Sequence, residues 1–406
     1  MKRRTFLQST GAGLLSGFVP WKASADTSRS PIGYLRTNWS QDQFSFGSYS
    51  YIAKGARRSD YRTLSRPIDN RIFFAGEATH PKRNSTVHAA YESGEIAAKS
   101  ILKTPASRIG IIGAGASGLS AAYHLAQAGY DVTVIEARSR IGGRVWTDNS
   151  LGIPLDLGAS WIHGIRGNPL TELADQLDIK RLQTDDSYVV RGRDGRLIRD
   201  RDAPDWLSEV TEIQHSAGAD RVQLNYTAYW NDSDYAGHDV IFPGGYAQML
   251  AGLQDDLQIH LATPITDVTI APTGVTLSAK GSQTEFVFDA VVVTVPLGVL
   301  KQNSIRFSPP LPEKKRSAIE RLGMGVLDKV YLQFSDVFWD AETTWIATPE
   351  NDLPRGQFNQ WLNLAKYIDQ PVIMAFNGGP PALDLAALTD QTVIDRALQT
   401  LRLAYP

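Results

Sequence analysis

The chain has 406 residues, of which 42% are hydrophobic and 21% charged, and these values are typical of a globular protein with more than one domain. Its 41 Lys and Arg residues nearly balance its 43 Asp and Glu residues, which argues against a nucleic-acid partner, because such partners require a basic face. The absence of cysteine excludes disulfides, thiolate metal sites, iron–sulfur clusters and a cysteine nucleophile.

The first 25 residues have the pattern of an export signal. The chain begins MKRRTFLQ, continues with a mildly apolar run over residues 9–19, and has the small-residue motif ASA just before Asp26. The apolar run is too short to cross a bilayer as a mature helix, and the paired arginines are similar to a bacterial twin-arginine signal. We expect residues 1–25 to be removed after export by the twin-arginine machinery, leaving a periplasmic or secreted protein without membrane contact; a disordered basic tail is the alternative.

A strand–turn–helix–strand unit is predicted between residues 108 and 136. The apolar run RIGII over residues 108–112 favours a buried parallel strand, and GAGASG follows it directly over residues 113–118. An Ala- and Leu-rich helix then extends to residue 128, and DVTVI over residues 131–135 predicts the second strand. This order of elements around a G-x-G-x-x-G motif indicates a dinucleotide site.

Each residue type in this unit has a physical reason. Gly113 permits a tight turn, Gly115 lets the backbone approach a pyrophosphate, and Gly118 allows the helix to pack closely on the strand. The phosphates should meet the first turn of the helix, which contains Ser117, because free N–H groups and the helix dipole favour anions there. Glu136, at the end of the second strand, should bind the ribose hydroxyls, which favours FAD or NAD over NADP.

The segment that follows favours FAD over NAD. Residues 136–144 read EARSRIGGR and resemble the E-A-R-x-R-x-G-G-R segment of the flavin-containing amine oxidases. The resemblance implies that Arg138, Arg144 and the backbone of Gly142 and Gly143 bind FAD, with Arg144 at the pyrophosphate. Taken alone, the basic stretch is also compatible with a solvated loop.

Two later segments resemble the same family. LDLGASWIHGIRGN, residues 155–168, is similar to the strand and loop that pass the flavin ring in polyamine oxidases, which implies cofactor contacts from Ala159, Ser160 and Trp161. Alternation over residues 265–270, 275–277 and 286–288 predicts an antiparallel meander. The backbone contact of the family to adenine would fall on Val268 in the first of these strands.

The motifs that close ordinary amine oxidases stand near the front of this chain. They are residues 39–51, 71–77 and 85–98, and the resemblance implies cofactor contacts from Trp39, Glu77 and Val87. Residues 103–107, KTPAS, would then join the old carboxyl end to the old amino end. We interpret the order as a circular permutation, which is best tolerated where termini are close and exposed; a rearranged gene model or cloning artefact would give the same string.

The candidate catalytic residue is Lys329. GMGVLDKVYLQF, residues 323–334, resembles the segment that carries the active-site lysine in polyamine oxidases and the lysine-specific histone demethylase. By this resemblance Lys329 holds a water against flavin N5; a strand-end lysine facing solvent is the alternative. The implied reaction is hydride transfer from the carbon beside an amine nitrogen to N5, followed by imine hydrolysis to an aldehyde and reduction of O2 to hydrogen peroxide, without a metal.

Four residues are candidates for the substrate site. Tyr49 matches one wall of the aromatic sandwich of the family, whereas Thr86 stands where several amine oxidases have the other wall. His163 resembles a histidine of spermine oxidases, and Trp361 is a candidate cavity residue for which core packing is the simpler interpretation. A one-sided cage argues against small benzylic or monoamine substrates and implies a site closer to that of the histone demethylases and spermine oxidases.

The sequence therefore predicts an α/β protein with a Rossmann-type FAD-binding domain and an interleaved α+β substrate domain. We assign residues 38–165 and 240–300 to the first domain, and residues 166–239 and 301–406 to the second. FAD should be bound non-covalently, since no cysteinyl linkage is possible, and the partners should be a small amine and O2. An L-amino-acid oxidase, which would need an arginine for the substrate carboxylate, a monoamine oxidase and a non-catalytic flavin-binding module are the alternatives.

Overall fold

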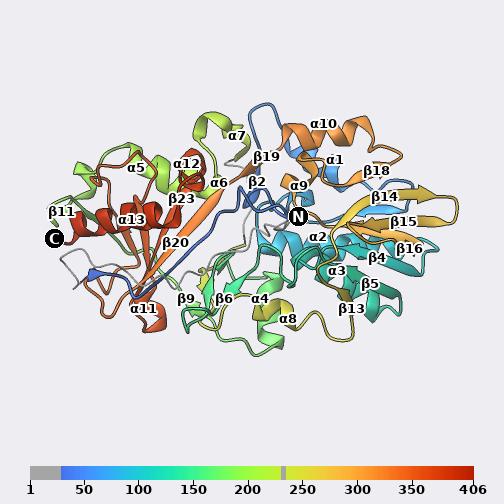
Figure 1. The fold of residues 1–406 in the computed structure, drawn as a ribbon, viewed down its shortest axis with the longest axis horizontal. Helices are drawn as coiled ribbons and strands as arrows, with labels where there is room; N and C mark the ends of the chain where they lie inside the picture. Colours follow the sequence, from blue (N-terminus) through green and yellow to red (C-terminus); the bar gives the residue numbers. More distant parts are fainter. Residues whose placement is uncertain (1–28, 230–234) are drawn as a thin grey trace, which may run out of the picture.

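The fold consists of two lobes that lie along the long axis of the molecule (Figure 1). A computed structural model describes residues 29–229 and 235–406, so the predicted export signal at residues 1–25 lies outside the described residues. We name the two halves by their sheets: the parallel-sheet lobe contains a five-stranded parallel sheet, and the large-sheet lobe contains a seven-stranded sheet. Within the described ranges, no helix is long and apolar enough to cross a membrane.

The parallel-sheet lobe is built around the predicted strand–turn–helix–strand unit. Its strand order is β13 (Gln258–His260), β5 (Asp131–Ile135), β4 (Arg108–Ile112), β17 (Ala290–Val293) and β3 (Ile72–Phe74). Both predicted strands of the unit are confirmed, and all four pairings in the sheet are parallel. Strand β3 comes before β4 in the chain but lies at the far edge of the sheet, beyond β17.

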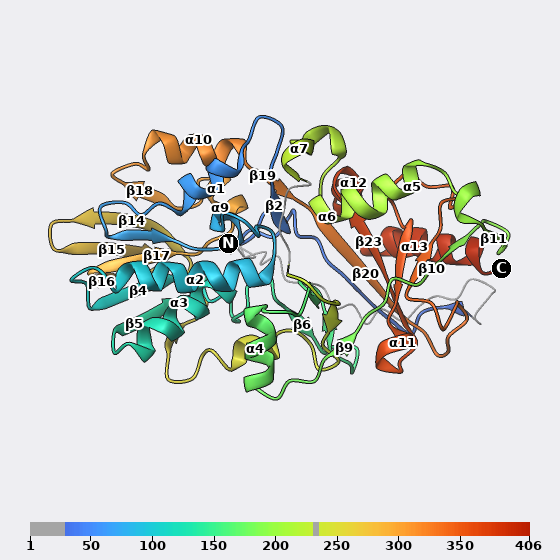
Figure 2. The same cartoon turned by 180° about the vertical axis from the view of Figure 1, so that it is seen from behind.

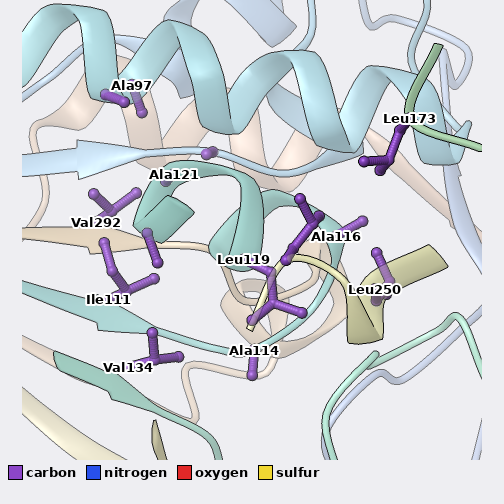
Figure 3. Close-up of a cluster of buried hydrophobic side chains, with 14 of the residues drawn as sticks. Ala97, Ile111, Ala114, Ala116, Leu119, Ala121, Val134, Leu173, Leu250 and Val292 are labelled. Atoms are coloured by element: carbon purple, nitrogen blue, oxygen red, sulfur yellow. The ribbon is translucent and has the colours of Figure 1, made fainter. Parts of the chain in front are cut away.

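Two helices pack closely beside this sheet, α2 (Val87–Ile101) and α3 (Ala116–Gln127). A Cβ atom at Gly94 of α2 would lie 2.2 Å from the backbone oxygen of Ser117, so only glycine allows the two helices to approach this far. Figure 3 shows Ala97, Ala121 and Leu119 in one buried cluster with the sheet residues Ile111, Val134 and Val292. Since α2 ends at Ile101 and β4 begins at Arg108, the predicted joining segment is a short connection.

The predicted antiparallel meander is confirmed as β14 (Ile265–Ala271), β15 (Gly274–Ala279) and β16 (Glu285–Phe288). Strand β18 (Arg306–Ser308) extends it by pairing in parallel with β14. Helix α10 (Glu313–Arg321) packs on α1 (Arg58–Ser65) and on α9 (Leu297–Lys301) in the same lobe. The predicted division of the chain placed residues 301–406 in the substrate domain, whereas β18 and α10 pack with the parallel-sheet lobe.

The large-sheet lobe has a mainly antiparallel sheet. Its order is β1 (Gly33–Arg36), β20 (Leu327–Gln333), β23 (Val372–Gly378), β22 (Gln360–Asn363), β21 (Trp345–Ala347), β10 (Tyr188–Arg191) and β11 (Leu197–Ile198). Helix α13 (Asp390–Ala404) buries residues at helical spacing in the core of this lobe, among them Val393, Ala397 and Leu401. Helices α11 (Ala365–Ile368) and α12 (Pro380–Ala386) complete the lobe.

Short strand pairs lie between the lobes (Figure 2). They are β2 (Tyr49–Tyr51) with β19 (Gly323–Gly325), β6 (Thr147–Asp148) with β7 (Leu155–Asp156), and β12 (Val240–Ile241) with β8 (Trp161–Ile162) and β9 (Leu182–Gln183). The remaining helical elements are η2 (Glu77–Thr79), α4 (Pro169–Gln176), η3 (Asp200–Asp202), α5 (Trp206–Ser208), η4 (Glu209–Gln214), α6 (His215–Ala217), η5 (Arg221–Gln223), α7 (Tyr226–Tyr229) and α8 (Gln248–Ala251).

Candidate functional site

A large cavity, of about 1240 Å3, is lined by residues of both lobes. One end is formed by the glycine turn after β4 and by the end of β5. The other end is formed by aromatic and polar side chains of β8, β20, β21 and β23. The two ends differ in chemistry, so we describe them in turn as the glycine end and the aromatic end.

The glycine end has the geometry of an anion cradle. Gly113 has a φ of +111°, and a Cβ atom at Gly118 would lie 1.9 Å from the Gly113 carbonyl oxygen. Both positions therefore require glycine, one for the turn and one for the close approach of α3. Helix α3 begins just after Gly115, so its first N–H groups face the cavity without partners inside the helix.

Glu136 is held at this end by the turn itself. Its carboxylate accepts the Ala114 N–H at 2.7 Å and the Arg138 N–H at 2.8 Å, and the residue is only 5% exposed. Arg138 in turn forms two hydrogen bonds, of 2.7 and 2.8 Å, with the carboxylate of Asp42. The carboxylate is thus fixed in place at the cavity wall, where a ribose can meet it.

An ion pair between a partly buried arginine and a buried glutamate lines the cavity. The Arg144 guanidinium contacts the Glu77 carboxylate at 2.9 Å and also donates to the Ser48 carbonyl oxygen. Glu77, 4% exposed, accepts the hydroxyl of Ser50 and the backbone N–H of Ser85 as well. These contacts tie η2, β2 and the loop before α2 together, so that one network shapes the middle of the cavity.

Lys329 reaches the cavity from the centre of β20 and is 4% exposed. Its Nζ donates to the carbonyl oxygens of Asp156 at 2.7 Å and Gly158 at 2.6 Å, and it lies 2.5 Å from the Ser160 hydroxyl oxygen. The solvent-facing alternative is therefore wrong for this lysine. Burial lowers the pKa of Lys329 below its ordinary value, and the negative charge of Asp156 opposes that shift.

Asp156 is the acidic residue whose charge acts on the pKa of Lys329. Its carboxylate accepts the Thr147 hydroxyl at 2.6 Å and the Tyr246 N–H at 2.9 Å. Burial raises the pKa of Asp156, and these two hydrogen bonds lower it in part. Lys329 thus contacts two backbone carbonyls and a hydroxyl directly, while the charge of Asp156 acts on its pKa.

The aromatic end contains three rings that pack together. Trp161 stacks on Trp345 with centroids 6.1 Å apart, and Phe376 lies 6.1 Å from Trp161 and 6.0 Å from Trp345. Nζ of Lys329 lies 5.9 Å from the centroid of Phe376. Electron-rich ring faces beside a cavity favour a cationic or amine ligand.

His215 borders the same end. It follows η4, a π-helical segment, and such segments are frequent at functional sites. Its Nδ1 lies 2.7 Å from Oε1 of Gln360, and burial lowers the pKa of His215 to about 4. The imidazole is therefore neutral at neutral pH. Tyr49 donates its hydroxyl to the His215 carbonyl oxygen, which fixes the position of the tyrosine ring.

Two more of the four substrate candidates, His163 and Thr86, also line the cavity. His163 stacks on Trp161 with centroids 6.3 Å apart, and its Nδ1 lies 2.6 Å from the Asp239 carboxylate. Thr86 is the N-cap of α2: its hydroxyl accepts the Ala89 N–H at 3.2 Å and donates to the Arg83 carbonyl. The hydroxyl of Thr86 thus has a capping function at the cavity edge.

The structure brings most of the predicted site residues to this one cavity. Those that line it are Trp39, Tyr49, Glu77, Thr86, Val87, Gly113, Gly115, Ser117, Glu136, Arg138, Gly142, Gly143, Arg144, Ala159, Ser160, Trp161, His163 and Lys329. Gly118 lies behind the turn, where it was predicted to permit close packing.

Two predicted residues do not reach the cavity. Trp361 is fully buried in the core of the large-sheet lobe, where its Nε1 donates to the Thr348 hydroxyl. Side chains alternate along β22, and it is the neighbouring Gln360 that faces the cavity. Val268 is also fully buried, in the core under the meander, whereas Ile265 at the start of β14 lines the cavity. The predicted adenine contact of the Val268 backbone stays a prediction, and Ile265 is the residue of the two that lines the cavity.

Several cavity residues were missed by the sequence analysis. They are Trp345, Gln360, Phe376, His215, Asp186 and Asp239. Strand β23 is buried at every position, so its sequence has no alternation that could single out Phe376. The only sequence signal that could have indicated His215 as a site residue is its place in a helical segment with many polar residues.

Comparisons with known proteins identify relatives of this site and fold. A family model described as "Flavin containing amine oxidoreductase" matches residues 14–102, 116–215 and 206–406. The chain is 30% identical over 365 residues to polyamine oxidase 2 of Arabidopsis thaliana, covering 75% of this chain and 74% of that protein. It is 31% identical over 357 residues to the probable polyamine oxidase 4 of the same plant, covering 73% and 71%.

Two solved structures have a similar fold. Cyclohexylamine oxidase from Brevibacterium oxydans gives a TM-score of 0.58 at 23% identity, covering 74% of this chain and 82% of that chain. A redesigned putrescine oxidase gives 0.54 at 21% identity, covering 73% and 81%. At these identities the structural likeness establishes the fold.

Proposed function

Because this chain belongs to the flavin-containing amine oxidase family, with FAD as its cofactor, we propose that it oxidises a C–N bond of a polyamine-type amine. The electrons would pass to O2, and the imine would hydrolyse to an aldehyde. The observation that carries this proposal is the buried Lys329 beside three aromatic rings, in a cavity whose opposite end is a glycine turn with a fixed carboxylate.

The residues present fit FAD. The cradle at Gly113 and Gly115 suits a pyrophosphate, Glu136 suits the adenosine ribose, and Arg144 supplies a cation between the two ends. When bound, FAD supplies the hydride acceptor of the reaction. No cysteine is available for a thioether link, which supports non-covalent binding.

The chain's own residues account for the handling of the amine. A protonated amine would bind against the faces of Trp161, Trp345 and Phe376. It must lose a proton before oxidation, and Lys329 is a candidate acceptor at Nζ because burial favours its neutral form. Hydrogen bonds to the two carbonyl oxygens hold this Nζ at the cavity wall.

The charges at the aromatic end favour an amine over an amino acid. The arginines that line the described cavity are Arg138 and Arg144, and both already contact carboxylates, of Asp42 and Glu77. Neither is positioned at the aromatic end for a substrate carboxylate. Two carboxylates line the cavity instead: Asp239 already contacts His163, and Asp186 remains for a second positive charge of the substrate.

The test is anaerobic reduction of the bound flavin. The purified protein should lose its yellow colour with spermidine or spermine, followed by absorbance at the flavin bands. Monoamines and L-amino acids form the comparison panel. Reduction by amino acids alone would overturn the polyamine assignment, and reduction by none of the amines would favour a flavin-binding module without turnover.

We also propose that the chain order is a circular permutation and that residues 1–25 direct export by the twin-arginine machinery to the periplasm. The edge position of β3, which precedes β4 in the chain, supports the first proposal. Intact-mass measurement with terminal peptide mapping of the protein from its native host tests both. Terminal peptides that match the conventional family order would overturn the permutation, and an uncleaved cytoplasmic protein would overturn export.

A further inference from the structure

The three oxygen atoms around Lys329 are not equivalent. Two of them, the carbonyl oxygens of Asp156 and Gly158, can only accept a hydrogen bond. The third, the Ser160 hydroxyl oxygen at 2.5 Å, can both accept and donate. Ser160 is also the one of these three groups that is a side chain, and it lines the cavity together with Lys329.

This set of partners satisfies the lysine in both of its protonation states. A charged ammonium has three N–H groups and can donate to all three oxygen atoms. A neutral amine has two N–H groups for the two carbonyls, and its lone pair can accept the Ser160 O–H. Neither state leaves a buried polar atom without a partner, so the pocket does not force Lys329 to remain charged.

We propose that Ser160 is a positioning residue that passes protons between Lys329 and the aromatic end of the cavity. In the forward step, a proton leaves an N–H or O–H group in the cavity and binds Ser160 Oγ. The hydroxyl proton of Ser160 leaves Oγ at the same time and binds Nζ. One O–H bond is broken and one is formed at Oγ, one N–H bond forms at Nζ, and no electrons change hands.

The groups that face Lys329 are compatible with this step. Asp156 lies behind the carbonyls and favours the charged product, and Tyr331 on the same strand donates its hydroxyl to the Asp156 carbonyl oxygen at 2.6 Å. Burial raises the pKa of Tyr331 well above its ordinary value, so the phenol stays neutral. His215 is neutral at neutral pH for the same reason. Among the described contacts of Nζ, Ser160 is therefore the group able to exchange a proton.

The proposal rests on the proposed amine oxidation, but one of its tests does not need a substrate. The pKa of Lys329 can be followed by NMR in FAD-bound protein with labelled lysine, its signal being assigned by its absence from Lys329→Met. Ser160→Ala should lower this pKa by about one pH unit, because the charged form loses a charge-assisted hydrogen bond and the neutral form a weaker one. Ser160→Thr, which keeps the hydroxyl, should restore it. An unchanged pKa in Ser160→Ala overturns the proposal whatever the substrate proves to be.

The second test uses flavin reduction in stopped flow over a range of pH. Ser160→Ala should slow reduction about tenfold or more at neutral pH and shift its pH profile, with Ser160→Thr recovering most of the rate. In a Lys329→Met background the same substitution should have no further effect, since Ser160 acts through the lysine. Equal losses in both backgrounds would overturn the proposal, whereas absence of reduction in the wild-type protein would refute the amine oxidation itself. Ser335→Ala, at an exposed hydroxyl, is the matched control.

Discussion

Asp328, the residue before Lys329, should make this protein less stable as the pH rises. It is 6% exposed and accepts the Trp39 N–H at 2.9 Å and the Thr37 hydroxyl at 2.8 Å, both on Oδ1. Burial raises its pKa from an ordinary value near 4 to about 6, and these hydrogen bonds reduce that shift. Because the folded pKa is the higher one, the unfolded chain loses the proton first. The contribution of protonated Asp328 to the folding free energy is therefore fully present below pH ~4, and it is lost as the pH rises through about 6.

The magnitude follows from the difference between the two pKa values. At 1.36 kcal/mol for each pH unit, ionisation of Asp328 should cost about 3 kcal/mol of folding free energy above pH ~6. Asp328→Asn removes the titration, while its amide oxygen can still accept both hydrogen bonds. The stability of the variant relative to wild type should thus increase by about 3 kcal/mol between pH 4 and pH 7.

The assay is urea unfolding of the FAD-bound protein at several pH values, followed by tryptophan fluorescence and flavin release. Asp336→Asn, which replaces an exposed carboxylate shortly after the end of β20, is the control. The fit of the amide adds a stability difference that does not depend on pH, so the test is whether the difference between Asp328→Asn and wild type changes with pH. A difference that is the same at every pH would refute the reasoning, since it would show that Asp328 titrates alike in both states.

Three further predictions concern the cavity. Lys329→Met should leave FAD bound but slow flavin reduction or reoxidation about tenfold or more in stopped flow; unchanged rate constants would contradict its role. Gly94→Ala should destabilise the protein by about 1–3 kcal/mol in urea and weaken FAD binding, because its Cβ would lie 2.2 Å from a backbone oxygen of α3; Ile96→Ala, on the exposed side of α2, is the control. Arg144→Ala should weaken FAD binding about tenfold in equilibrium dialysis, since buried Glu77 loses its partner; equal FAD content would argue against this.

The local elements could be predicted from the sequence because their signals are local. The strand at residues 108–112 and the strand at 131–135 are found at the predicted residues, since glycines and apolar runs mark their limits. The helix expected up to residue 128 ends at Gln127. The chain near Lys329 could be placed on a strand for the same reason.

The rest depends on contacts between distant segments. Trp361 and Gln360 are neighbours on β22, and only the packing of the lobe decides which one faces the cavity. Trp345 and Phe376 meet Trp161 across three strands that are far apart in the sequence. No local pattern reveals such a contact, so Trp345 and Phe376 were missed although Trp161 and Lys329 beside them were predicted.

The opposite charges of Asp328 and Lys329 also affect the register with which β20 pairs in the sheet during folding. The two side chains point to opposite faces of the strand, one to the backbone at Trp39 and one to the carbonyl oxygens at Asp156 and Gly158. A slip of one residue would turn the Asp328 carboxylate toward those carbonyls and bury its negative charge against the partial negative charges of the carbonyl oxygens. The adjacent charges thus favour the correct alignment of β20, because a misaligned strand would have a higher free energy even in the protein without cofactor.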